Sequence, residues 1–511
     1  MLSILVCHSY FLRLDQKQME RGKPYPPLAT LQVAAMLRKA GHQVWLFDAM
    51  LAEGLEDYNR VLRATQPQLV LFYEDTFNFL SKMCLGTMRR AACDMIASAR
   101  HGSARVIVAG PDVSDAPGPY LQAGADLALI GEGLSALLVL LPRLDARPHA
   151  QSDELREGLA GIASLSQGEL VTVNGAKILA APQEGIAAWD LVDVERYRAT
   201  WLRAHGYFSL NMAASRGCSF RCTWCAKPTW GNQYLQRTPQ DVASEMIYLK
   251  RNFNPDHIWF ADDIFGFRTD WVSAFAAAAE AAGGGVPFTI QTRADLMSER
   301  MARELENAGC AEAWLGAESG SQRILDAMNK GTTVGELLTA RERLKSAGIR
   351  VGFFIQLGYL NEQLDDILAT RHLLAAARPD EIGVSVSYPL PGTKFYELVK
   401  AQLGGKTHWH ESSDLEMMFH GTYTSDFYRK IRNLLHDQVS LQAMDTSQAM
   451  DTPPAMDTAQ AMERAMDATP VSADPSVDRA HAERALDQRW DDLLIHEAEY
   501  RSLPHRPTTT G

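Results

Sequence analysis

Several features that would place a chain in a familiar class are scarce in this sequence. Seven cysteines occur among 511 residues, which is too few, and odd in number, for a disulfide framework. The 50 Lys and Arg residues are outnumbered by 62 Asp and Glu residues, and the formal charge of -12 argues against a long nucleic-acid partner. No apolar run reaches the roughly 18 residues that a membrane span needs.

The amino-terminal stretch MLSILVCHSY has no basic segment and no small-residue cleavage site, so it does not resemble a secretory signal. We therefore expect a cytoplasmic protein without a membrane span. Hydrophobic residues make up 46% of the chain, which is enough for sizeable cores in two or three domains. In a reducing compartment, clustered cysteines bind metal more often than they form disulfides.

The first part of the chain alternates short apolar runs with amphipathic helical segments. The runs are LSILVC, QVWLFD, QLVLFY, RVIVAG and LALIG. This alternation predicts an α/β fold with a Rossmann-like, doubly wound parallel sheet. Ligands of such sheets bind at the carboxyl ends of the strands. Because no G-x-G-x-x-G follows the first strand, a nicotinamide dinucleotide is not indicated.

Proline and glycine gather in the predicted loops at those strand ends, in YPPLAT, AGPDVS and GEGLSA. The residues of interest are Pro27, Gly110, Pro111, Gly131, Glu132 and Gly133. They are either ordinary tight turns between strand and helix or a ligand-binding edge, and the pattern alone does not choose between the two.

A second series of strand-like runs begins near Asn211. The runs are NMAASRG, HIWFAD, PFTIQTR, EAWLGAE, VGFFIQL and IGVSVSY. Six such units in about 180 residues predict a partial (βα)6 barrel of the TIM type, in which functional groups gather at the carboxyl ends of the strands.

The whole chain is predicted to have six segments. They are a Rossmann-like domain (1–145), a connector (146–205), the partial barrel (206–400), a helical C-terminal cap (401–440), a low-complexity linker with a repeated AMD sequence (441–475) and a helical tail (476–511).

Three cysteines fall within eight residues, in SRGCSFRCTWC, after the first strand of the second series. A structural zinc site needs a fourth ligand, and the nearest histidines, His205 and His257, are distant in sequence. A Cys-x-x-Cys redox pair would leave Cys218 unexplained. Three thiolates on a four-iron cluster leave one iron open to a small molecule, which would make the site catalytic.

On these residues the sequence resembles the radical S-adenosylmethionine (SAM) superfamily, whose C-x3-C-x2-C signature follows the first strand of a partial barrel. Cys218, Cys222 and Cys225 match its cluster ligands, and Trp224 matches the aromatic residue before the third cysteine. The resemblance implies that SAM binds the open iron of a 4Fe–4S cluster and is cleaved to a 5′-deoxyadenosyl radical. It also implies a reductant such as flavodoxin or ferredoxin.

The resemblance extends to the SAM pocket at later strand ends. Glu318 and Ser319 in GAESGS match residues that in relatives contact the ribose and amino-acid end of SAM, although Ser319 and Ser321 are equally suited to cap a helix. Arg293 is placed to meet the SAM carboxylate, and Gln356 lies where relatives surround the adenine.

Two carboxylates, Asp262 and Asp263, end the second strand of this series in FADDIFG. They are candidates for binding SAM or positioning substrate. Capping of the next turn is an equally good interpretation.

A Rossmann-like domain ahead of such a barrel is the arrangement of the cobalamin-binding radical SAM subfamily. Its members often carry PP-x-G, GG-P-H and GEGE where this chain has YPPLAT, AGPDVS and GEGLSA, which departs at Leu134. The resemblance thus implies cobalamin contacts from these loops. The D-x-H-x-x-G motif of cobalt-ligating histidines is absent and His8 stands alone, so cobalamin is either held without a histidine ligand or lost.

The stretch NQYLQRTPQDVASEM is similar to that of anaerobic tetrapyrrole cyclases and of radical SAM proteins of hopanoid gene clusters. The leading hypothesis is a cobalamin-dependent radical SAM enzyme that methylates or cyclises a small-molecule metabolite at an unactivated carbon. One alternative is a methylthiotransferase with a second cluster on Cys7, Cys84 and Cys93, although the last two fall in a helical pattern. Another is a cobalamin- or redox-sensing protein without turnover.

Overall fold

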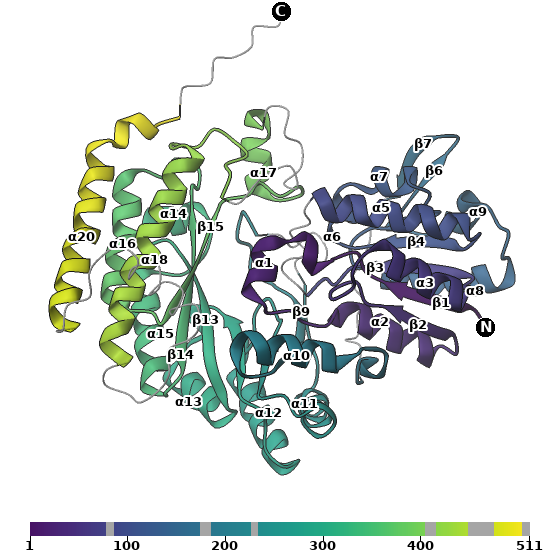
Figure 1. Cartoon of the computed structure of the whole chain (residues 1–511), viewed down its shortest axis with the longest axis horizontal. Coiled ribbons are helices and arrows are strands. Elements are labelled where there is room, and N and C mark those ends of the chain that lie inside the picture. The colour runs from purple at the N-terminus through teal and green to yellow at the C-terminus, as the bar shows by residue number, and fades with distance from the viewer. Residues whose placement is uncertain (78–85, 174–184, 226–232, 404–414, 448–474, 503–511) are drawn as a thin grey trace, which may run out of the picture. The chain divides into compact units, whose positions relative to one another are not determined.

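The computed structural model describes residues 1–77, 86–173, 185–225, 233–403, 415–447 and 475–502 (Figure 1). It divides into two compact units, residues 1–220 with 226–290, and residues 221–225 with 291–511. The division assigns Cys218 to the first unit, and Cys222 and Cys225 to the second.

The first unit opens with a seven-stranded sheet of order β2-β1-β3-β4-β5-β6-β7. Its strands are β1 (Ser3–Cys7), β2 (Gln43–Phe47), β3 (Leu69–Tyr73), β4 (Arg105–Ala109), β5 (Leu127–Leu129), β6 (Ile162–Ser166) and β7 (Glu169–Val173). The five predicted strands β1 to β5 pair in parallel, which confirms the doubly wound arrangement. The strand order reverses between β1 and β3, so the loops after these strands form the topological switch point.

The last two strands of this sheet come from the segment that the sequence predicted to be a connector. β6 pairs with β5, and β7 with β6, in antiparallel register, so the sheet is mixed rather than wholly parallel. Gln167 and Gly168 join β6 to β7 with φ values of 50° and 85°. Two consecutive positive φ angles are those of a tight hairpin turn, whose twist matches the flanking strands.

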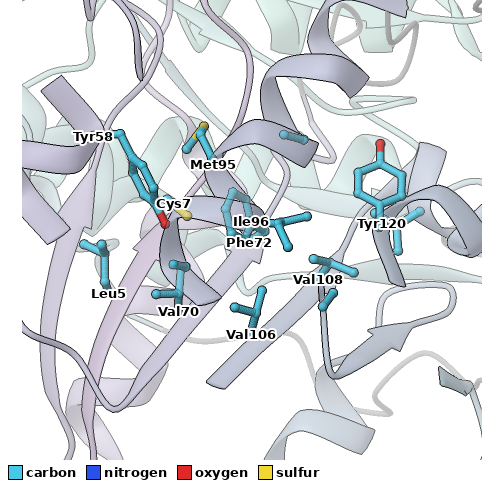
Figure 2. Packing of buried hydrophobic residues seen from close by; sticks show 14 of the residues in the cluster. Leu5, Cys7, Tyr58, Val70, Phe72, Met95, Ile96, Val106, Val108 and Tyr120 are labelled. Carbon is cyan, nitrogen blue, oxygen red and sulfur yellow. The ribbon is translucent and has the colours of Figure 1, made fainter. Parts of the chain in front are cut away.

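Helices cover both faces of this sheet. They are α1 (Gln16–Arg21), α2 (Leu28–Lys39), α3 (Leu55–Thr65), α5 (Gly86–His101), α6 (Pro111–Asp115), α7 (Pro117–Gln122), α8 (Leu134–Ala146) and α9 (Ser152–Arg156). In the core, alternate strand residues such as Leu5, Val70 and Phe72 pack against Tyr58 of α3 and Met95 of α5 (Figure 2). Their burial follows from the two-residue side-chain period of a strand.

The second sheet is parallel, with the order β15-β14-β13-β12-β11-β8, and forms the predicted half barrel. Its strands are β8 (Ser209–Met212), β11 (His257–Phe260), β12 (Phe288–Thr292), β13 (Cys310–Glu318), β14 (Arg350–Leu357) and β15 (Glu381–Val386). The helices between them are α11 (Pro239–Phe253), α12 (Thr269–Ala281), α13 (Glu299–Asn307), α14 (Gln322–Ala327), α15 (Val334–Ser346) and α16 (Leu364–Ala377). Before β8 lies α10 (Val194–His205).

The run NMAASRG differs from its prediction as a single strand. The barrel strand β8 ends at Met212, and β9 (Ser215–Gly217) pairs in antiparallel register with β10 (Tyr234–Gln236) as a separate two-stranded sheet. The break falls at Ala213 and Ala214, two small buried residues that could equally continue a strand.

The second unit ends in α17 (Lys394–Val399), α18 (Ser425–Ser447) and α20 (Pro475–Ile495). α18 continues through residues 441–447, where a linker was predicted to begin, and the rest of the AMD repeat lies outside the described residues. Trp490 of α20 is fully buried, and Arg371 of α16 lies over its ring. No helix in the described ranges is long and apolar enough to cross a membrane.

Candidate functional site

The cysteine segment leaves the barrel through the short strand β9. Ser215 donates its hydroxyl to Asp262 Oδ1, and Ala214 N donates to Asp262 Oδ2 at 3.0 Å. Asp262 follows β11 and is buried, so it ties the entry of the cysteine segment to the neighbouring barrel strand. It thus holds the base of the segment.

Burial raises the pKa of Asp262 to about 7, while the hydrogen bonds from Ser215 and Ala214 oppose the rise. Because the folded state holds the proton more tightly than the unfolded chain, this group stabilises the fold most below pH 4, and the stabilisation is lost as the pH rises through 7. Asp262→Asn mimics the protonated form and can bond to both partners. We expect urea unfolding from pH 5 to 8.5 to give a flatter stability profile, with a gain of roughly 1–3 kcal/mol at the alkaline end. Parallel profiles for variant and wild type would contradict this.

Cys218 is buried, whereas Cys222 and Cys225 are half-buried. The last two are anchored by the backbone around Thr223, whose N–H donates to Met328 O at 2.9 Å. Asn329 Nδ2 donates to Arg221 O at 2.8 Å, from the same loop. The loop between α14 and α15 therefore fixes residues 221–225 in the second unit.

Two cations lie beside Cys222. Arg293 Nη1 is 3.9 Å from its Sγ, and Arg293 Nη2 donates to Lys330 O at 2.7 Å. Burial lowers the pKa of the Lys330 ammonium, but Glu318 and Cys222 raise it by more, so Lys330 stays charged. Positive charge beside the Cys222 sulfur suits the binding of an anionic group there.

Glu318 ends β13 in an unusual conformation. Its φ is 60°, and its buried carboxylate accepts from Lys330 Nζ at 2.6 Å. Left-handed backbone at a residue other than glycine is strained, and here the ion pair with Lys330 holds the Glu318 side chain. Gly316 makes room for the pair, because a Cβ there would lie 2.5 Å from Lys330 Nζ.

Of three further predicted residues, Ser319 and Gln356 have side-chain hydrogen bonds and Trp224 has none among the described residues. Ser319 Oγ accepts from Ser321 N at 3.1 Å, and Ser321 heads α14 without a side-chain cap bond. Gln356 Nε2 donates to Ser387 Oγ at 3.0 Å, while its Oε1 is buried without a partner among the described residues. The indole N–H of Trp224 likewise meets no acceptor in the described part of the chain, so it is available to an acceptor that a cofactor would bring.

No three His, Cys, Asp or Glu side chains of the described residues are placed to share a single metal ion. A four-iron cluster makes a different demand, because each thiolate binds its own iron. Cys222 and Cys225, with Arg293, Lys330 and the Trp224 N–H in the same unit, are suited to such an anionic cluster and to a carboxylate ligand.

The predicted loops of the N-terminal sheet are held by internal contacts. Gly110 has φ 154°, and a Cβ on it would lie 2.7 Å from the side chain of Glu74. Pro111 starts α6, and Pro27 O accepts from Leu31 N at 2.9 Å as α2 begins. These contacts account for the residue types without a ligand, so their role in binding cobalamin stays a prediction.

The loop after β5 differs from the others because its buried carboxylate forms an ion pair with a residue outside the N-terminal sheet. Glu132 is buried and forms an ion pair with Arg216 of β9. Gly131 and Gly133 flank it with φ values of 78° and 72°, which allow the loop to turn the carboxylate inward. The Glu132 carboxylate is therefore already paired with another side chain of the same unit.

His8 is 1% exposed, and its Nε2 lies 2.9 Å from Asp48 Oδ1 and 3.0 Å from Ala49 N. Burial lowers the pKa of His8, but Asp48 and neighbouring carboxylates raise it by more. A ring so enclosed is not placed to ligate cobalt. A cavity of about 430 Å³ lies nearby at the end of β2, lined by Asp48 and Tyr197 among others, and is too small for a whole corrin.

Two of the three cysteines of the methylthiotransferase alternative, Cys7 and Cys93, lie in the described residues. Cys7 is buried in the core of the N-terminal sheet, where burial raises its pKa (Figure 2). Cys93 lies on α5 with its Sγ 3.8 Å from Pro119 O. Cys84 is outside the described residues.

Sequence reasoning missed Arg216 and Lys330. Arg216 lies inside the segment SRGC, and Lys330 lies inside MNKGTT, in the loop between α14 and α15 that holds residues 221–225. A basic residue directly before a glycine was the available signal. Neither partner could be named, because Glu132 and Glu318 are 84 and 12 residues away.

Two curated relatives match most of the chain. An uncharacterized methyltransferase of Pyrococcus horikoshii is 24% identical over 383 residues, covering 74% of this chain and 79% of the relative. A putative methylthiotransferase of Methanocaldococcus jannaschii is 25% identical over 373 residues, covering 70% and 78%.

A third curated relative and one solved structure also match the chain. The anaerobic magnesium-protoporphyrin IX monomethyl ester cyclase of Cereibacter sphaeroides is 26% identical over 282 residues, covering 54% of this chain and 45% of the cyclase. The cobalamin-dependent SAM radical enzyme OxsB, solved with aqua-cobalamin, has the same fold with a TM-score of 0.68 and 15% identity, covering 98% of this chain and 76% of that one.

The family model for the radical SAM superfamily matches residues 212–374, which run from the end of β8 through the cysteine segment, Arg293, Glu318, Lys330 and Gln356 to α16. The chain therefore carries a radical SAM domain, whose cofactors are a 4Fe–4S cluster and SAM.

Proposed function

We propose that this protein is a cobalamin-dependent radical SAM enzyme that methylates or cyclises a small-molecule metabolite at an unactivated carbon. The observation that carries the proposal is the half-buried Cys222 beside Arg293 and Lys330, in a loop that also holds Cys225. The methyltransferase and cyclase among the relatives support these two reaction types.

The three cysteines would hold the cluster, and Arg293 and the Glu318–Lys330 pair would hold SAM. When bound, the cluster supplies the electron that cleaves SAM to a 5′-deoxyadenosyl radical. Arg293 Nε and Nη2 donate to the two carboxylate oxygens of Asp295 at 2.8 and 3.1 Å, so a SAM carboxylate would be met by Nη1, which lies beside Cys222. Glu318 would present a buried acceptor to a ribose hydroxyl. Buried side chains around them keep water from the site.

The test is anaerobic reconstitution of the full chain with iron and sulfide, followed by SAM and dithionite. We expect 5′-deoxyadenosine to form, with flavodoxin or ferredoxin as the biological reductant to be substituted afterwards. An intact cluster that yields no 5′-deoxyadenosine would rule out radical chemistry and leave the sensing alternative.

Iron content separates the methylthiotransferase alternative, which the relative from Methanocaldococcus jannaschii keeps open. About four irons per chain supports one cluster and about eight supports two. The burial of Cys7 in the apolar core favours one cluster.

Cobalamin is expected to bind at about one per chain without a protein imidazole, because His8 is enclosed and held by Asp48. The measurement is the visible spectrum of the wild type and of His8→Ala after incubation with cobalamin. An unchanged spectrum in the variant is the expected result. Loss or a shift of the bands would assign His8 to cobalt, and no binding by either protein would remove cobalamin from the proposal.

A further inference from the structure

A buried ion pair connects the loop after β5 with the strand that leads into the cysteines. Arg216 Nη1 meets Glu132 Oε1, and the two side chains are 7% and 1% exposed. Both residues belong to the first compact unit. Removing one partner from such a pair leaves an uncompensated buried charge, so the two side chains constrain each other strongly.

The loop of Glu132 is held by the end of β3 and by the segment after β4, at the carboxyl edge of the N-terminal sheet. Tyr73 OH, at the end of β3, donates to Glu132 O at 2.8 Å. Gly131 N donates to Ser114 Oγ at 2.9 Å, and Ser114 Oγ donates to Gly110 O at 2.8 Å in the loop after β4. The carboxylate is therefore presented from a fixed support.

Arg216 lies two residues before Cys218. Its backbone pairs with Leu235 of β10, and Gly217 follows with φ 77°. So short a segment leaves little freedom between the guanidinium and the first cysteine. A shift of Arg216 would be passed to Cys218 through Gly217.

We propose that Glu132 and Arg216 are positioning residues for the iron–sulfur cluster, through which the N-terminal sheet sets the place of Cys218. The inference rests on the proposed function, since it takes Cys218 as a cluster ligand. It gives Glu132 a task different from contact with cobalamin. The pair touches neither iron nor SAM in this role, so its loss changes the setting of a ligand and leaves all three cysteines present.

The test compares Glu132→Gln with Asp126→Asn in the anaerobically reconstituted full chain. Asp126 is a matched control, because it precedes β5 as Glu132 follows it, is 9% exposed at its side chain and pairs with Arg105 at 3.0 Å. For Glu132→Gln we expect shifted g-values in the EPR spectrum of the reduced cluster. We also expect a fall of about tenfold in kcat for 5′-deoxyadenosine, with KM for SAM changed by less than about threefold. Asp126→Asn should lose stability yet keep the wild-type spectrum and kcat.

A second variant tests whether the effects of Glu132→Gln arise only from loss of stability. Glu132→Leu with Arg216→Met replaces the pair by apolar side chains of similar size, which buried pairs often tolerate. We expect it to fold and still to show the shifted spectrum and lower kcat. Wild-type EPR and kcat in both variants would overturn the inference, as would losses equal to those of Asp126→Asn. If the wild type itself assembles no cluster or cleaves no SAM, the proposed function fails instead.

Discussion

Cys222→Ala is expected to lower SAM cleavage to the rate seen without enzyme, with an iron content well below about four per chain. Cys222 has its Sγ 3.9 Å from Arg293 Nη1 and raises the pKa of Lys330, so it is a cysteine with cations beside it. The measurement is iron content together with 5′-deoxyadenosine formation after reconstitution. The fold should survive, because a half-buried side chain is shortened by one atom.

Cys310→Ala is the control for this variant. Cys310 begins β13, is buried, and has its pKa raised by burial, which describes an inert thiol in the same compact unit. It should keep full iron and full SAM cleavage at a cost of about 1 kcal/mol in stability. Equal activity in Cys222→Ala and Cys310→Ala would remove Cys222 from the cluster.

Glu318→Gln is expected to destabilise the second unit by about 3–5 kcal/mol and to weaken SAM binding at least tenfold, on the order expected when one partner of a buried pair is removed. The ammonium of Lys330 would be left without its carboxylate, and its pKa would fall because burial alone lowers it. Urea unfolding and equilibrium binding of SAM to the reconstituted protein measure the two effects.

Asp380→Asn serves as the matched control, since Asp380 pairs with the buried Arg341 at 3.2 Å in the same unit. It should destabilise the fold while leaving SAM affinity unchanged. Glu318→Leu with Lys330→Met should restore stability and still bind SAM weakly. SAM affinity equal to wild type in that double variant would show that the Glu318–Lys330 pair is structural only.

Strand patterns were sufficient to predict both sheets, because apolar alternation and helix signals are local. Pro239–Phe253, for example, begins after Thr238, whose side chain accepts from Asp241 N at 3.2 Å. Such helix caps are determined by residues that are neighbours in the sequence. The antiparallel pairing of β6 and β7 with the first sheet was not predicted, because pairing direction depends on which edge the chain returns to, and no local pattern encodes that.

The sequence by itself determined the two-sheet architecture and the cysteine spacing, with the cofactor chemistry that this spacing implies through its resemblance. Only the tertiary structure decided which charges meet. In the folded protein Glu132 pairs with Arg216, Glu318 pairs with Lys330, and Asp262 accepts a hydrogen bond from Ser215. The partners in these contacts are 12 to 84 residues apart in the sequence. The sequence around a carboxylate does not show which distant side chain will be buried against it.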